Sequence, residues 1–284
     1  MARIQSYDVA VVMFDAHWLS CMIAALIYPK KTLLWGHGLG RNPVANLMRV
    51  ILARRAAGVL LYEESAKADF ADAGCHVERI FMAGNTVEVM NPRRAQGQRS
   101  RFLYVGRLQA RKRIDQFLRA FADVRPHLPS GTGITIVGDG SGRGELESLT
   151  SSLGIADQVE FLGELYDDDA LAAQYARAIA YVSPGHVGLG ALHAFGHGVP
   201  VVTGKSESHA PEIENVVDGV NGYLYGGENS ELGEILIRMC SNSGVAEKMG
   251  VNALHRYQAE RTIEQMANRF ADAIRYVGDG ASHG

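Results

Sequence analysis

Two basic residues and one glycine-rich turn have the types and spacing that a phosphate site needs. Arg107 and Lys112 follow an expected strand, and the turn 185–190 joins another expected strand to a short apolar helix. Glycines let backbone N–H groups approach an anion, and a helix start adds a partial positive charge. Two fixed cations facing such a turn would neutralise a diphosphate. The alternatives are a plain strand–helix turn and surface cations paired with nearby acids.

Histidines supply the other candidate side chains. His37 stands between two glycines at the end of an expected strand, where open parallel sheets bind ligands. His193 and His197 are four residues apart on the short apolar helix. A zinc protease needs a glutamate directly after the first histidine of such a pair, and Ala194 occupies that position, so we expect no metal site.

Strands and helices alternate along the chain and must position these residues. Short loops rich in glycine follow the strands, which is typical of parallel, doubly wound α/β sheets. Strands are expected at 7–14, 31–35, 59–62, 79–82, 102–105, 134–137, 159–162, 181–182 and 199–202, with the last two helices at 230–241 and 262–276.

A polar segment, 91–100, divides the chain. It lacks apolar periodicity and is rich in Pro, Gly, Gln and Arg, which predicts a linker. We therefore expect a Rossmann-like domain over 1–90, a second α/β domain over 101–260 and a helix with a tail over 261–284. Four strands with two or three helices would leave the first sheet partly uncovered, which predicts an exposed apolar edge and self-association.

Composition narrows the partners and the location. The net charge of −3 does not favour nucleic acid, and three scattered cysteines suggest no disulfide framework. No signal peptide is visible and the longest apolar run, 18–28, is too short to cross a bilayer, so we expect a cytoplasmic protein. Residues 1–100 carry 12 Lys and Arg against 8 Asp and Glu. The helix that starts at Pro43 has one apolar stripe, and its arginines lie mostly off that stripe. We expect the stripe to pack on the sheet with the arginines in water, and the basic excess leaves open a peripheral contact with the inner face of an anionic membrane.

The segment 181–202 resembles the sugar-donor site of the family 4 glycosyltransferases, which have the two-domain GT-B fold. Gly185 and His193 stand where the family has the two glutamates of its Glu-x7-Glu motif. The family's first domain is also longer than the part that precedes the linker here. The matching positions are Gly188-Leu189, Gly198 to Val202, Gly106-Arg107-Leu108 with Lys112, Glu212-Ile213 and Asp218 to Leu224.

The resemblance implies a retaining transferase that moves a sugar from a nucleoside-diphosphate sugar to a polysaccharide or glycolipid acceptor, with no cofactor. Arg107 and Lys112 would hold the diphosphate as it leaves, and His37 would reach the acceptor side. His193 would bind the ribose, either as a hydrogen-bond acceptor or, when charged, through the diphosphate. The domain 101–260 would bind the nucleotide sugar, and the helix 261–284 would cross back to the first domain. The remaining donor-binding candidates are Gly106, Gly138, Gly185, His186, Val187, Gly188 and Leu189.

Two other classes of function remain open. A catalytically inactive nucleotide-sugar-binding or partner protein derived from the family would keep nucleotide affinity without turnover, and the two missing glutamates favour it. A nucleotide-sugar epimerase shares the fold class but needs acid–base carboxylates in its cleft. Turnover with product analysis distinguishes the three.

Overall fold

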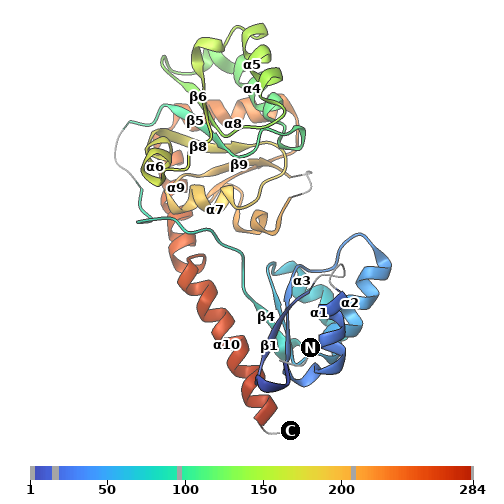
Figure 1. Ribbon diagram of the computed structural model, residues 1–284. Coiled ribbons are helices and arrows are strands. Elements are labelled where there is room, and N and C mark those ends of the chain that lie inside the picture. Colours follow the sequence, from blue (N-terminus) through green and yellow to red (C-terminus); the bar gives the residue numbers. More distant parts are fainter. Residues whose placement is uncertain (1–3, 15–18, 95–97, 206–208, 283–284) are drawn as a thin grey trace. The chain divides into compact units, whose positions relative to one another are not determined.

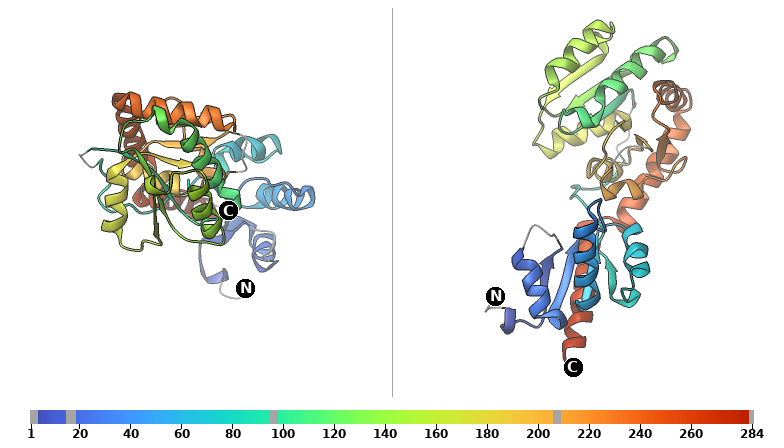
Figure 2. Two further views of the ribbon diagram at one scale, coloured as in Figure 1. Left: turned by 90° about the horizontal axis from the view of Figure 1, so that it is seen from above. Right: turned by 90° about the vertical axis from the view of Figure 1, so that its right-hand side faces the viewer.

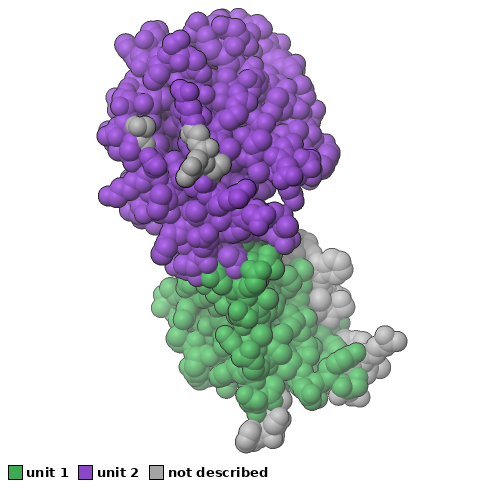
Figure 3. All heavy atoms as spheres, turned by 90° about the vertical axis from the view of Figure 1, so that its left-hand side faces the viewer, with its two compact units in different colours: residues 1–86, 263–284 green, residues 87–262 purple. Residues whose placement is uncertain are grey.

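The structure, a computed structural model, describes residues 4–14, 19–94, 98–205 and 209–282, which form two compact units (Figures 1 and 3). The smaller unit consists of Met1–Thr86 and Ile263–Gly284, and the larger unit of Val87–Thr262. The unit boundary thus falls between residues 86 and 87, before the expected linker, and the last helix belongs to the smaller unit. No helix within the described ranges has the length and apolarity to cross a membrane.

The larger unit is built on a six-stranded parallel sheet in the order β10-β9-β8-β5-β6-β7. The order reverses between β5 and β8, which makes a topological switch point of the kind where such sheets bind ligands. Its elements are β5 (Arg101–Val105), α4 (Ile114–Val124), β6 (Gly133–Val137), α5 (Arg143–Ser152), β7 (Val159–Gly163), α6 (Asp168–Arg177), β8 (Ala178–Ser183), α7 (Gly190–Gly196), β9 (Val201–Gly204), β10 (Gly222–Tyr225), α8 (Asn229–Ser241) and α9 (Ser243–Glu260).

Helices cover both faces of this sheet (Figures 1 and 2). On one face, α4 and α8 bury Phe117, Phe121 and Leu236 against the strands. On the other face, α6, α7 and α9 bury Tyr175 and Phe195. This arrangement follows from the apolar stripe of each helix, because a parallel sheet is stable only when both faces are covered.

The smaller unit is built on a four-stranded parallel sheet in the order β1-β2-β3-β4. In Figure 1, α1, α2 and α3 lie on one side of this sheet and α10 lies on the other. Trp35 on β2 packs edge-on against Phe270 of α10, with ring centroids 5.1 Å apart. The elements are β1 (Ala10–Met13), α1 (Leu19–Ile27), β2 (Thr32–Gly36), α2 (Pro43–Arg55), β3 (Gly58–Leu61), α3 (Ser65–Asp72), β4 (Ile80–Met82) and α10 (Ile263–Ser282).

Helix α2 differs from the expectation that its apolar stripe would pack on the sheet and its arginines would face water. Val44 and Leu47 are 70% and 61% exposed, whereas Leu52 is buried. Arg49 turns inward instead, where its guanidinium lies over the Phe14 ring and donates to the Gly38 carbonyl. Asn42 caps the helix by accepting from the N–H groups of Val44 and Ala45, so the helix starts as its sequence predicts and differs only in which face is buried. The expected self-association remains a prediction, and the edge strand β1 exposes Val11 and Met13.

Two elements of the larger unit, α9 and β10, were not expected. Helix α9 buries Ala246, Met249, Ala253 and Tyr257 on one face, and two of these four residues are small alanines. Gly250 on the same helix packs so closely that a Cβ atom there would overlap the Gly198 carbonyl oxygen. Because small side chains give a weak apolar period, this helix left little signal in the sequence.

Candidate functional site

The loops that follow β5 and β6 meet by direct backbone contact. The Gly106 N–H donates to the Val137 carbonyl (2.9 Å) and the Gly138 N–H to the Gly163 carbonyl (2.6 Å). Gly138 has φ of +125°, and a Cβ atom there would overlap the Gly106 carbonyl oxygen. Glycine is therefore required at position 138 by this close approach, which fixes where the chain leaves β5 with Arg107.

The structure brings Lys112 onto the glycine turn. Lys112 ends the short 3-10 helix η4 (Ala110–Lys112), and its Nζ donates to the His186 carbonyl over 2.6 Å. The backbone contact is equally close, because the Gly185 N–H donates to the Lys112 carbonyl (3.1 Å) and the His186 N–H to the Arg111 carbonyl (2.9 Å). The loops after β5 and β8 thus join at the switch point of the sheet.

These bonds revise how the turn can bind an anion. We expected the N–H groups of the turn to face a phosphate. Instead, the N–H groups of Gly185 and His186 donate hydrogen bonds to carbonyl groups of the loop 111–112. The buried Val187 also donates its N–H, over 3.1 Å, to Nδ1 of His209. Gly188 stays half-buried and Leu189 is exposed at the open end of the turn. Any positive charge offered to a ligand here comes mainly from side chains.

Arg107 and Lys112 supply that charge. Arg107 is exposed at the carboxyl end of β5, and Lys112 is half-buried. Burial lowers the pKa of Lys112, the charge on Arg111 lowers it further, and Glu212 partly offsets both. Neither Arg107 nor Lys112 forms an ion pair with a carboxylate in the described part of the chain.

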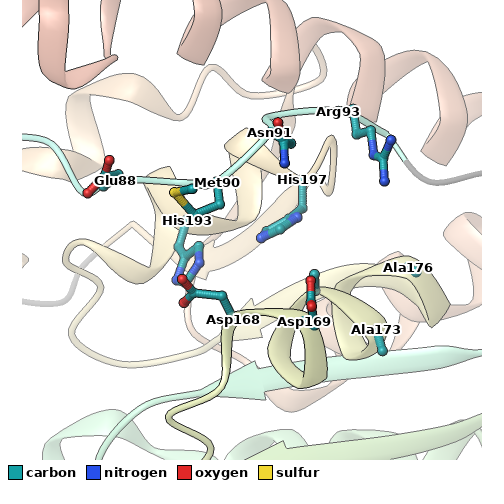
Figure 4. Close-up of a pocket in the computed structure, with 11 residues that line it drawn as sticks. Glu88, Met90, Asn91, Arg93, Asp168, Asp169, Ala173, Ala176, His193 and His197 are labelled. Carbon is teal, nitrogen blue, oxygen red and sulfur yellow. The ribbon is translucent and has the colours of Figure 1, made fainter.

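His193 on α7 and His197 directly after this helix line a pocket of about 300 Å³ (Figure 4). The buried Tyr175 ring stacks on His197, with centroids 4.6 Å apart, and contacts His193 at 5.2 Å. Figure 4 shows Asp168, from the first turn of α6, pointing toward His193. Burial lowers the pKa of His193, and Asp168 partly offsets that shift. The pocket therefore holds a mostly neutral imidazole next to a carboxylate.

His37 belongs to a compact cluster in the smaller unit. Its Nδ1 lies 3.5 Å from Oε2 of Glu63, and its ring packs against Tyr62. Glu63 also accepts a hydrogen bond from the Gly38 N–H (2.8 Å). Burial by itself would raise the pKa of Glu63, but the bonds from His37 and Gly38, with the nearby charge of Arg49, hold it below its ordinary value. The cluster pairs an ionised carboxylate with an exposed imidazole at the carboxyl end of β2.

Three residues near these sites were missed by the sequence analysis. Glu63 follows β3, and the strand-end rule that selected His37 would have found it. His209 accepts from Val187 through Nδ1, so its Nε2 carries the proton toward the Gly204 carbonyl (2.6 Å). Glu212 was matched only as part of a motif, yet its buried carboxylate lies near Gly188 and Lys112. No group of three or more metal-ligating side chains occurs among the residues with described positions.

The space around position 185 yields a prediction about the missing glutamate. A Cβ atom there would overlap the Arg111 carbonyl oxygen, whereas at position 188 the nearest atom would be 3.7 Å away. We expect Gly185→Glu, which introduces the residue that the sequence resemblance implies at this position, to destabilise the larger unit by about 2 kcal/mol or more through overpacking. Gly188→Ala should leave stability unchanged within about 0.5 kcal/mol. Urea denaturation measures both, and equal stability of the two variants would contradict the packing shown here.

His197 predicts how stability depends on pH. Burial lowers its pKa to about 4, helped by the charges on His193 and Arg99. An unfolded histidine binds its proton near pH 6.5, so folding is favoured above that pH and loses up to about 3 kcal/mol as pH falls to about 4. His197→Asn should flatten the urea-denaturation profile in this window. His255→Asn, at an exposed position on α9, is the control and should keep the wild-type slope. A wild-type slope in His197→Asn would contradict the prediction.

Comparisons with known proteins agree with this architecture. Residues 88–256 match the family described as glycosyl transferases group 1. The D-inositol 3-phosphate glycosyltransferase of Actinosynnema mirum is 33% identical over 185 residues, which cover 60% of this chain and 43% of that protein. A GDP-mannose-dependent alpha-(1-6)-phosphatidylinositol monomannoside mannosyltransferase of Mycolicibacterium smegmatis is 31% identical over 173 residues, 57% of this chain and 44% of that protein. The chain spans less than half the length of these two relatives.

Solved structures extend the likeness to both units. HepE of Anabaena, in complex with UDP, superposes with a TM-score of 0.75 at 20% identity, covering 96% of this chain and 81% of that one. A sucrose-phosphate synthase of Thermosynechococcus elongatus gives 0.72 at 19% identity, covering 95% and 73%. At such identities the likeness concerns the fold alone, and the two Rossmann-like units have the GT-B fold. The resemblance found in the sequence is confirmed at the level of the family, and the chain belongs to the group 1 glycosyl transferases.

Proposed function

We propose that this chain transfers a sugar from a nucleoside-diphosphate sugar to a glycan or glycolipid acceptor, with retention of configuration. The observation that carries the proposal is the position of Lys112, whose Nζ sits on the glycine turn at the switch point of the larger sheet. Arg107 leaves the neighbouring strand end as a second cation. The names of two relatives and the UDP bound to HepE support a nucleotide-linked sugar as the substrate class.

The two cations would act on the diphosphate that leaves. As the bond between the sugar C1 and the phosphate oxygen breaks, negative charge grows on that oxygen, and fixed cations stabilise it more than they stabilise the intact donor. Lys112 suits this role because it is half-buried, and its lowered pKa records an unfavourable desolvation that a bound anion would offset. Side-chain cations in this role would replace a divalent metal.

The pocket beside α7 would hold the ribose end of the donor. His193 takes the position of the family's second glutamate, and its neutral imidazole can accept a hydrogen bond from a hydroxyl. Asp168 next to it provides the carboxylate that position 193 lacks. The donor's hydroxyls would therefore meet a histidine–aspartate pair where relatives present a glutamate.

His37 would serve the acceptor side, with Glu63 as its positioning residue. As the acceptor oxygen bonds to the sugar C1, its hydroxyl proton would pass to the departing diphosphate oxygen, and an imidazole held by a carboxylate can orient such a hydroxyl. Glu63 is 17% exposed and stays ionised, so it holds the exposed ring of His37 in place. The exposed apolar side chains of α2, together with its arginines, could lie on an anionic membrane. Such a peripheral contact would bring the chain to a glycolipid acceptor.

The phosphate-binding part of the proposal is tested without turnover. We expect Arg107→Ala and Lys112→Ala each to weaken the binding of nucleoside diphosphates by about tenfold or more, because each removes a charged contact. The affinity for the matching nucleosides should change little. Isothermal titration calorimetry across uridine, guanosine and adenosine diphosphates measures this. Arg119→Ala, an exposed cation on α4, is the control. Unchanged diphosphate affinity in both variants would overturn the assignment.

The acceptor-side roles are tested by turnover with product analysis. We expect His37→Ala to lower kcat/KM for the acceptor by about tenfold to a hundredfold, and Glu63→Gln to lower it less. Both variants should keep wild-type affinity for nucleoside diphosphates, since both residues lie in the smaller unit. The matched control is Glu78→Gln, which alters the exposed His76–Glu78 pair of the same unit. If the control variant lost as much activity as Glu63→Gln, the proposed role of Glu63 in positioning His37 would be contradicted.

A further inference from the structure

A second basic pocket lies in the smaller unit, at the amino edge of its sheet. The pocket measures about 480 Å³ and takes its polar lining from residues that precede strands and from the end of α10. Lys30 lies just before β2, Arg55 ends α2 before β3, and Arg79 lies just before β4. Tyr276, Val277 and Asp279 of α10 complete the lining used here.

The three cations of this pocket have no partner within the described chain. Their side chains make no hydrogen bond and no ion pair with another described residue. Arg55 has a structural reason to be there, since a cation in the last turn of α2 complements the helix dipole. Lys30 and Arg79 have no such reason, because each stands on a three-residue 3-10 helix. Three positive charges therefore line one pocket, and the helix dipole accounts for the position of only one of them, Arg55.

The pocket is separate from the proposed transfer site. All four strands of the sheet are parallel, so its amino edge is opposite the carboxyl edge that carries His37 and Glu63. Strand β2 places five residues between the two edges, about 17 Å at the usual rise per residue. A ligand in this pocket would therefore leave His37 accessible.

Charge and lining define the ligand class. Three cations and the single carboxylate of Asp279 leave a net charge of +2, which complements a dianionic phosphate monoester. Val277 is buried beneath the pocket, and Tyr276 presents part of its ring, held edge-on against Phe81. These apolar surfaces suit the organic part of a phosphorylated molecule better than a bare ion.

We propose that the pocket lined by Lys30, Arg55 and Arg79 binds a phosphate group carried on a small organic moiety. Lys30 and the two guanidinium groups contact the phosphate, and Tyr276 contacts the carbon skeleton. The same chemistry is offered by a soluble phosphate monoester and by a phosphate-bearing lipid headgroup. Occupancy of this site ties together the residues before β2, β3 and β4 with the end of α10.

The test uses the full chain with Arg107→Ala and Lys112→Ala already introduced, so that the transfer site does not contribute phosphate binding. Calorimetry at low salt measures the affinity for glycerol 3-phosphate and for inorganic phosphate. Flotation with phosphatidic acid vesicles, whose headgroup is a phosphate monoester, against phosphatidylcholine vesicles, measures headgroup binding. Lys30→Glu and Arg79→Ala remove the site, and Arg41→Ala, an exposed cation of the same unit outside the pocket, is the control. Circular dichroism confirms that each variant is folded.

We expect glycerol 3-phosphate to bind more tightly than inorganic phosphate, and each pocket variant to weaken it by about tenfold. Asp279→Asn should have the opposite effect and tighten binding, because it removes the one negative charge in the lining. Flotation with phosphatidic acid vesicles that glycerol 3-phosphate displaces would assign the site to a headgroup, and its absence would assign it to soluble phosphate esters. The proposal is overturned if glycerol 3-phosphate does not bind, or if Arg41→Ala weakens binding as much as Lys30→Glu. An unchanged affinity in Asp279→Asn would also count against it.

Discussion

The contact between the loop 111–112 and the turn 185–186 is the constraint on which the candidate transfer site depends. Two backbone hydrogen bonds and the bond from Lys112 Nζ to the His186 carbonyl join segments that are more than 70 residues apart in the chain. They meet because β5 and β8 are neighbours in the sheet, although two other strands, β6 and β7, lie between them in the sequence. The same contact uses the N–H groups that a phosphate would otherwise bind, so the site relies on the charges of side chains.

Two glycines in the larger unit allow neighbouring backbone segments to pack closely against each other. Gly138 and Gly185 each stand where a Cβ atom would overlap a carbonyl oxygen of a neighbouring loop. At position 185 this closeness leaves no room for a glutamate. A glycine at this position and the close packing of the loop 111–112 on the turn therefore depend on each other. The carboxylates that remain nearby, Asp168 and Glu212, come from other elements.

The smaller unit uses the two edges of one sheet for different charges. Its carboxyl edge holds His37 against the ionised Glu63, while its amino edge gathers Lys30, Arg55 and Arg79. Helix α10 supplies the cover that four strands and three helices lacked, because it buries Trp35, Leu33 and Leu60 on the second face. A segment from the far end of the chain thereby completes both the core of this unit and its basic pocket.

The sequence by itself determined the alternation of strands and helices, the parallel sheets, the family and the place of Arg107, Lys112 and His37 at strand ends. These follow from apolar periodicity and from glycine at strand ends, which are local signals. Tertiary structure alone decided the rotation of α2, the burial of α9 through small residues, the partnership of His37 with Glu63 and the use of the Gly185 N–H by Lys112. Each depends on which surfaces meet across long sequence separations, and no local pattern encodes that.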